Sequence, residues 1–242
     1  MTRLRLTPTR PLAMAFAIAA RLLMAVLLSG AAGCAGQGVT KTGFLTNYDQ
    51  MTPKANHEDD LIYVNPGLKT ANYKAVIIDP VVWHPVADGP RLSPEIAARM
   101  ETAFHDSLVK EFGAHFQVVD GSHCGNCAGV LRVRAAVTNV RRSRWYFNVI
   151  PVALGVGAAA AGDFVPPIPP PAPGGASEEL TAVDAATGET MVAIATYNNG
   201  MPWNAVGQIL PYRHARRAFT LASKLLVQQV TAGAAPPAAA RS

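Results

Sequence analysis

The sequence has few charged residues, few cysteines and none of the short motifs that mark common enzyme sites. Charged residues make up 15% of its 242 positions, and aromatic residues make up 7%. It contains no phosphate-binding Gly-rich loop, no Gly-x-Ser-x-Gly motif and no His-Glu-x-x-His motif. Its six histidines are scattered along the chain. We therefore predict no catalytic residue, no metal site and no cofactor.

The sequence also lacks a hydrophobic run long enough to span a bilayer comfortably. The apolar stretch from Leu22 to Cys34 ends in small residues and follows a leader with four arginines and no acidic residue. This pattern is typical of a cleavable targeting segment. Ala31-Ala-Gly-Cys34 resembles the lipobox of bacterial lipoproteins, although Ala31 stands where Leu is usual. The resemblance implies removal of residues 1–33 and acylation of Cys34, including palmitate; the alternative is an ordinary secretory signal cleaved nearby.

A lipid-modified Cys34 would hold the protein on a membrane. Several acyl chains, at about 0.8 kcal/mol per buried methylene, bind far more strongly than a single myristoyl chain. The next residue is Ala35 rather than the Asp that often retains lipoproteins in the inner membrane. We therefore expect a lipid-anchored protein of the outer membrane that faces the periplasm.

Removal of the leader leaves seventeen Lys and Arg against sixteen Asp and Glu. This balance gives no reason to expect a nucleic-acid partner. The remaining length suits one domain. We predict a lipidated tether over residues 34–60, a domain over 61–231 with an insertion at about 147–174, and a low-complexity, disordered tail over 232–242. Three apolar residues of the tether, Phe44, Leu45 and Tyr48, could dock on the domain.

Periodicity predicts an α+β domain: a single antiparallel or mixed sheet of about five strands, covered by two helices. The helices are expected from Ser93 to Gly113 and over residues 212–230, because apolar residues recur there at helical spacing. Strand patterns occur over residues 61–64, 73–83, 116–119, 130–140, 177–184 and 190–196. Pro80 requires an edge or a bulge in its strand. Gly188 indicates a hairpin turn between the last two strands.

Two cysteines besides Cys34 lie close together in Ser122-His-Cys-Gly-Asn-Cys127. In an exported protein we predict a disulfide between Cys124 and Cys127. Redox or metal chemistry with His123 is an alternative, although one histidine and two cysteines fall one ligand short of a closed zinc site.

Two further segments have alternative interpretations. Arg141, Arg142 and Arg144 lie beside two aromatic residues and could bind phosphates or lipid head groups, or form a solvated strand end. The stretch from Phe147 to Pro173 is rich in Ala, Gly and Pro, with no charge before Asp163. It could be buried, or be an irregular insertion that contacts a membrane or partner.

Four segments together resemble an uncharacterised family of bacterial lipoproteins, catalogued as domain of unknown function 3313. They are Gly43-Phe-Leu-Thr-Asn-Tyr48, Tyr73-Lys-Ala-Val-Ile-Ile-Asp-Pro80, Leu131-Arg-Val-Arg-Ala-Ala-Val-Thr-Asn-Val140, and Glu178-Glu179 leading into Val183-Asp-Ala-Ala-Thr-Gly-Glu189. The resemblance implies an envelope lipoprotein with an α+β domain and no assigned activity.

The leading functional hypothesis is a non-enzymatic binding or assembly module that contacts an envelope protein or peptidoglycan. Whether the protein is an enzyme stays open at this point. A periplasmic hydrolase would use Asp79, Glu178, Glu179 and Asp184 as general acid and base, which requires two carboxylates about 5–9 Å apart. Redox or metal handling through the cysteine pair is the third possibility.

Overall fold

One mixed sheet of eight strands forms the centre of the protein. The computed structural model describes residues 39, 41–54, 57–87, 89, 91–121, 127–144, 174–199 and 210–233, with the backbone alone for 57–59. Its elements are η2 (Tyr48–Gln50), β1 (Thr52–Lys54), β2 (His57–Val64), η3 (Thr70–Asn72), β3 (Ala75–Ile78), β4 (Val82–Trp83), α2 (Pro94–Gly113), β5 (Gln117–Val118), β6 (Val130–Arg141), β7 (Gly175–Asp184), β8 (Thr190–Asn199) and α5 (Arg213–Ala232). The strand order is β1-β2-β8-β7-β6-β3-β5, and β4 also pairs with β6.

Three long antiparallel strands, β6, β7 and β8, make up the middle of the sheet. The β7–β8 hairpin confirms the predicted turn. The Asp184 carboxylate accepts hydrogen bonds of 2.9 Å from the amides of Ala186 and Thr187, and Gly188 takes a φ of +75° that suits glycine. The turn therefore fixes the register of the two strands.

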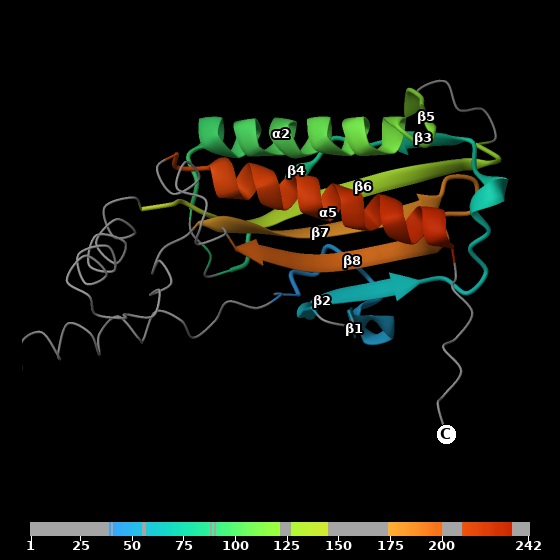
Figure 1. The fold of residues 1–242 in the computed structure, drawn as a ribbon, viewed down its shortest axis with the longest axis horizontal. Helices are drawn as coiled ribbons and strands as arrows, with labels where there is room; N and C mark the ends of the chain where they lie inside the picture. The colour runs from blue at the N-terminus through green and yellow to red at the C-terminus, as the bar shows by residue number, and fades with distance from the viewer. Residues whose placement is uncertain are drawn as a thin grey trace, which may run out of the picture. The chain divides into compact units, whose positions relative to one another are not determined.

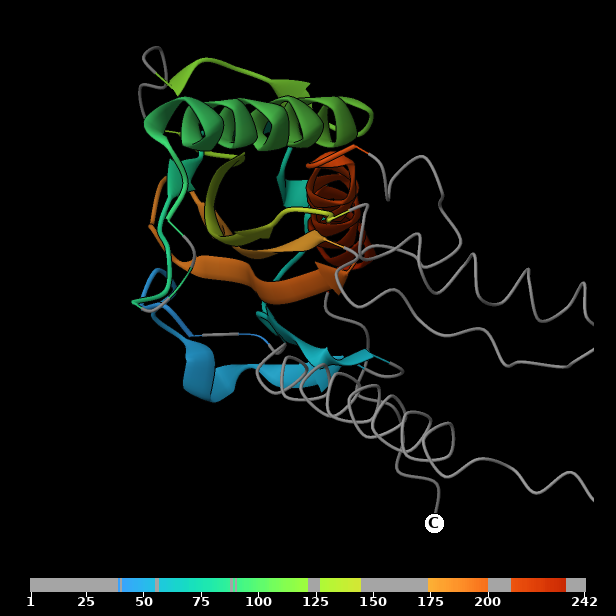
Figure 2. The ribbon, with the colours of Figure 1, turned by 90° about the vertical axis from the view of Figure 1, so that its left-hand side faces the viewer.

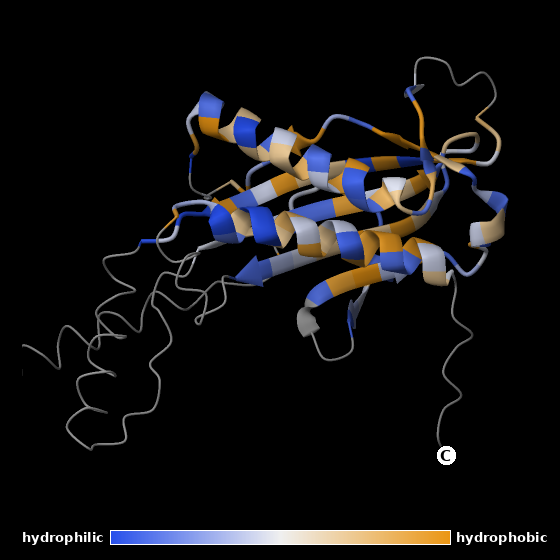
Figure 3. Cartoon of the chain, turned by 45° about the horizontal axis from the view of Figure 1, so that its top comes forward, coloured by the Kyte–Doolittle hydropathy of each residue, from blue (hydrophilic) through white to orange (hydrophobic). Residues whose placement is uncertain are grey.

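The helices α2 and α5 lie side by side on one face of the sheet, the helix face (Figures 1 and 2). The rings of Phe104 and Phe219 stack between them with centroids 4.9 Å apart. Both are fully buried, as are Leu108 and Phe112 on the same side of α2. Figure 3 shows apolar and polar residues alternating along both helices. The two helices were predicted from this apolar spacing, and the structure confirms them.

The two helices run in the same direction. Figure 1 shows both of them starting at the same end of the sheet. One cavity there is lined by residues near the start of both helices. A second cavity, further along, is lined by residues from the middle of α2 and by Thr220 of α5. The positive ends of two helix dipoles are therefore brought together at one end of the domain.

The sheet has more strands than the predicted five or so, and this part of the prediction was wrong. Pro80 lacks an amide hydrogen, so the segment around it divides into β3 and β4, which pair with successive stretches of β6. β1 is a three-residue strand containing Pro53. β2 begins at His57, within an acidic run that shows no strand alternation. The class, a mixed sheet covered by two helices, is confirmed.

The segment predicted as a tether takes part in the fold. Leu45 and Met51 are buried against Ala193 and Ala195 of β8, on the side of the sheet away from the helices. We call this side the strap face, and residues 41–51 the N-terminal strap. In Figure 2 these blue residues lie across the sheet from the helices. No helix in the described part of the chain is long and apolar enough to cross a membrane.

Candidate functional site

Glu179 is a buried carboxylate that holds the N-terminal strap on the sheet. It lies in the middle of β7 on the strap face and is 1% exposed. Its Oε1 accepts hydrogen bonds from the Thr42 amide at 3.1 Å and the Tyr48 hydroxyl at 2.8 Å. Its Oε2 accepts one from the Thr42 hydroxyl at 2.6 Å. The carboxylate thus joins residues more than 130 positions apart in the sequence.

The strap is folded around the hydroxyl of Tyr48. This oxygen accepts hydrogen bonds from the amides of Gly43 at 3.0 Å and Leu45 at 3.2 Å. Gly43 has a φ of +89°, which residues with a side chain rarely adopt. Burial, followed by the hydrogen bond to Glu179, raises the pKa of Tyr48. The phenol therefore stays protonated and donates to the carboxylate while it accepts from the strap backbone.

Small residues of the sheet let the strap lie close to it. Glu179 is flanked by Ala136 of β6 and Ala195 of β8, which are its partners in the strand register. Methyl side chains leave room above the sheet for Leu45, which is 4% exposed. The ring of Phe44 lies 6.1 Å from that of His84, next to β4. Apolar packing and the Glu179 hydrogen bonds thus act together on one short segment.

A row of buried polar residues crosses the helix face. Glu178 of β7 pairs in register with Thr196 of β8, and the Thr196 hydroxyl donates a 2.5 Å hydrogen bond to Asp60 of β2. The three residues, which we call the polar row, are at most 4% exposed. Neither carboxylate oxygen of Glu178 has a hydrogen-bond partner. Burial raises the pKa of Glu178 well above its usual range; the Arg141 charge opposes this shift and the Asp60 charge adds to it.

His214 lies buried in the first turn of α5. It is 2% exposed, and neither ring nitrogen has a hydrogen-bond partner. Burial, and then the charges of Arg217 and Arg213, lower its pKa. Burial and the nearby arginine charges therefore both favour the neutral imidazole.

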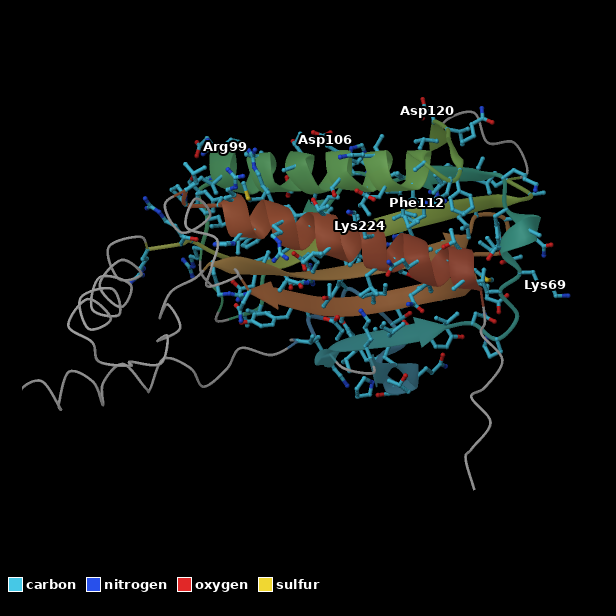
Figure 4. All side chains as sticks on the ribbon, viewed as in Figure 1. Lys69, Arg99, Asp106, Phe112, Asp120 and Lys224 are labelled. Atoms are coloured by element: carbon cyan, nitrogen blue, oxygen red, sulfur yellow. The ribbon has the colours of Figure 1, made fainter. Side chains whose placement is uncertain are left out.

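The same end carries a cavity of about 420 Å³, lined by Arg99, Met100, Leu210, Pro211, Tyr212, Arg213 and Arg216. Two smaller cavities of about 290 and 270 Å³ continue between α2 and α5, and Arg216 lines all three. We call the three cavities together the helix groove. Figure 4 shows Arg99 near the start of α2 and Asp106 further along the helix. The size is that of a small ligand site.

The four carboxylates considered for a hydrolase do not come together. Glu178 and Glu179 point to opposite faces of the sheet because they are consecutive residues of one strand. The Asp184 carboxylate accepts a hydrogen bond of 2.9 Å from the Tyr73 hydroxyl. Burial, followed by this hydrogen bond, raises the pKa of Tyr73 to about 12. Asp79 lies 3.9 Å from the guanidinium of Arg132. Each carboxylate has a separate structural environment, which gives no support to paired acid–base catalysis.

Arg141 is half-buried and contacts neighbouring residues of the sheet. Its guanidinium lies 4.2 Å from the ring centroid of Tyr197, a cation–π contact. Burial lowers its pKa, although the charges of Tyr197 and Glu178 oppose the shift. Arg141 therefore packs against Tyr197 of β8, whereas Arg142 and Arg144 of the same cluster are exposed.

Several predicted site residues lie outside the described part of the chain. They are Cys34, His123, Cys124 and the stretch from Phe147 to Pro173. Cys127 is described, with a φ of +52°. The lipid attachment and the disulfide therefore stay predictions. Within the described residues, no group of three or more His, Cys, Asp and Glu side chains is placed to hold a metal ion.

Comparison with solved structures gives distant similarities. The PelC dodecamer from Paraburkholderia phytofirmans aligns with a TM-score of 0.38 and 9% identity, covering 68% of this chain and 96% of that one. Protein XCC0632 from Xanthomonas campestris, of family DUF330, aligns with a TM-score of 0.27 and 16% identity, covering 68% and 87%. No curated protein matches the sequence.

The family comparison covers most of the domain. Residues 40–226 match the family described as Protein of unknown function (DUF3313). The matched range begins next to the strap, runs through all eight strands and ends within α5. The chain belongs to the DUF3313 family.

Proposed function

We propose that this protein is an outer-membrane lipoprotein that faces the periplasm and serves as a binding or assembly module, not as an enzyme. Its partner is a component of the envelope, either a protein or peptidoglycan. The lipobox-like residues before Cys34 support the anchor. The separation of the carboxylates supports a role without hydrolysis.

The observation that carries the proposal is the attachment of the strap to Glu179. Cys34 precedes Val39, the first described residue, by five positions, and five residues span at most about 18 Å. Val39 packs with Leu45 on the strap face. A lipid on Cys34 would therefore hold the strap face near the membrane. Rigid attachment so close to an anchor suits a protein that presents its other side to a partner.

Replacement of Cys34 by Ser tests the anchor. Because the serine hydroxyl does not accept the diacylglycerol, the Cys34→Ser variant should lose palmitate labelling completely and leave the outer-membrane fraction. Because Cys34 precedes the matched range 40–226 in the sequence, we expect the released protein to melt at the same temperature as the lipid-free domain.

The matched control is Cys127→Ser, which replaces another cysteine of the same chain but leaves the predicted lipid site intact. This control should be labelled as strongly as the wild type. Label that persists on Cys34→Ser, or a wild-type protein released with a free amino terminus, would contradict the lipoprotein assignment.

A further inference from the structure

The helix groove carries an excess of positive charge that the fold itself does not need. α5 contains no acidic residue, and its first two turns carry Arg213, Arg216 and Arg217. These three cations repel the positive end of the helix dipole. Among the described residues, no carboxylate lies within ion-pair distance of Arg213 or Arg216. Such a local conflict is expected where function, not stability, selects the residues.

The groove also has an apolar part. Leu210 is 46% exposed, which is unusual for a large aliphatic residue in this domain. It lines the same cavity as Tyr212, and the buried Met100 forms part of the wall. A ligand that fits this cavity therefore needs an anionic group next to an apolar one.

The groove is elongated, which favours a chain-like ligand. Its three cavities follow α2 and α5 from Arg213 past Arg216 to Thr220. The far part is mixed in charge, because Asp106, Lys110 and Glu111 line it together. The arginine end is therefore suited to an acidic residue, and the rest to a polar continuation of the same segment.

The position of the groove argues against a membrane lipid as its ligand. The groove opens on the outer side of the helices, where Arg99 and Arg216 are exposed. The strap lies on the other face of the sheet. A helix layer and a sheet layer, each about 10 Å thick, separate the two. If the anchor follows directly before the strap, the groove faces away from the membrane.

We propose that the helix groove binds an acidic, partly apolar polypeptide segment of another envelope protein. A carboxylate of the segment lies among the guanidinium groups of Arg99, Arg213 and Arg216, and a neighbouring apolar side chain packs on Leu210 and Tyr212. This inference rests on the proposed binding function and specifies the chemistry of the partner.

Charge reversal in the groove tests the proposal on the purified mature lipoprotein in detergent. The probe is a short fluorescent peptide in which glutamate alternates with leucine and serine. The Arg213→Glu/Arg216→Glu variant should bind it about tenfold more weakly or worse at physiological salt. Its melting temperature should stay equal or rise, since glutamate is favourable at a helix N-terminus.

The matched control reverses two exposed charges outside the groove, Lys69→Glu and Lys224→Glu, with the same change in net charge. Figure 4 shows Lys69 at the far end of the domain from Arg99. The control should bind within about twofold of the wild type. A peptide with glutamine in place of glutamate should not bind measurably to the wild type or to the control variant.

Three outcomes would overturn the proposal. The two double variants could weaken peptide binding equally, or the glutamine peptide could bind the wild type as tightly as the glutamate peptide does. In the third outcome, inorganic phosphate or phosphatidylglycerol vesicles would displace the probe as effectively as unlabelled peptide does. The first would indicate nonspecific charge attraction, and the last a phosphate ligand. These results do not depend on lipidation of Cys34. If the groove fails while the anchored protein still photo-crosslinks to an envelope partner through another face, the binding function stands without it.

Discussion

Replacement of Glu179 by Ala is expected to release the N-terminal strap and to lower the free energy of unfolding by about 3–5 kcal/mol. The change removes the acceptor of three hydrogen bonds, two from Thr42 and one from Tyr48. A hydrogen bond to a charged acceptor contributes about 1.5–3 kcal/mol, and donors left buried add a desolvation cost. For a domain of this size, the melting temperature should fall by roughly 10 °C.

Hydrogen exchange should locate the effect. The amides of Thr42, Gly43 and Leu45 depend on Glu179 or on the Tyr48 hydroxyl that it positions. They should lose protection in Glu179→Ala, while the amides of β7 keep most of theirs. Tyr48→Phe should reproduce part of the effect, and the two substitutions together should cost less than the sum of the single changes, because they break one network.

Asp49→Ala is the matched control. Asp49 lies in the same strap but is exposed, so its loss should change stability by less than about 0.5 kcal/mol. If Glu179→Ala were as stable as this control, with the strap amides still protected, the apolar contacts of Leu45 and Met51 would suffice to hold the strap.

The elements with strong local patterns were predictable. α2 begins after Ser93 at Pro94 and ends at Gly113, and its apolar residues recur at helical spacing. The β7–β8 hairpin follows from Gly188 between two alternating segments. These features depend on residues that lie close together in the sequence, within one helix or one hairpin. They can therefore be predicted from the local sequence pattern.

The strap contacts and the helix groove depend on long-range packing and were not predictable in the same way. That Phe44, Leu45 and Tyr48 could dock was foreseen from their apolar character, and Leu45 is indeed buried. Their partner Glu179 was not foreseen, because 131 or more positions separate it from the strap residues it binds.

The alternation of side chains along β7 separates Glu178 from Glu179. Consecutive residues of a strand point to opposite faces, so Glu178 and Glu179 could not have formed a catalytic pair. The same rule would have placed one carboxylate on each side of the sheet. What the rule could not provide is the environment of each side chain, which depends on the helices and the strap.

Replacement of Glu178 by Gln is expected to stabilise the protein at alkaline pH. Burial raises the pKa of Glu178 well above the value of about 4.3 found in unfolded chains. The native state therefore binds a proton that the unfolded state has already lost. Stability contributed by this group is complete below pH 4 and falls as the pH rises toward the native pKa, by about 1.4 kcal/mol per unit.

Glutamine keeps the size and polarity of the protonated acid but does not ionise. At pH 8 we expect Glu178→Gln to have a higher free energy of unfolding than the wild type, because glutamine does not ionise in the buried site. At pH 4.5 the two proteins should differ by less than about 1 kcal/mol. Urea unfolding between pH 4.5 and 8.5 measures both values. Glu111→Gln, the same change at a half-buried residue of α2, is the matched control.

His214 gives an opposite pH dependence that the same experiment separates. Its lowered pKa means that the unfolded state takes up a proton below about pH 6.5 while the buried imidazole stays neutral. Its stabilising contribution is therefore present above that pH and is lost as the pH falls. Because His214 is present in both proteins, its contribution cancels in the difference between the wild type and Glu178→Gln, which isolates the carboxylate.

The charge of Arg141 is the reason why Glu178 could instead be ionised in the native state. Its charge favours the ionised form of Glu178 and so opposes the effect of burial. If Glu178→Gln were less stable than the wild type at pH 8, the carboxylate would be ionised in the native state and held by Arg141 across the sheet. If it is more stable, burial outweighs that attraction, and the polar row lowers the stability of the fold at neutral pH.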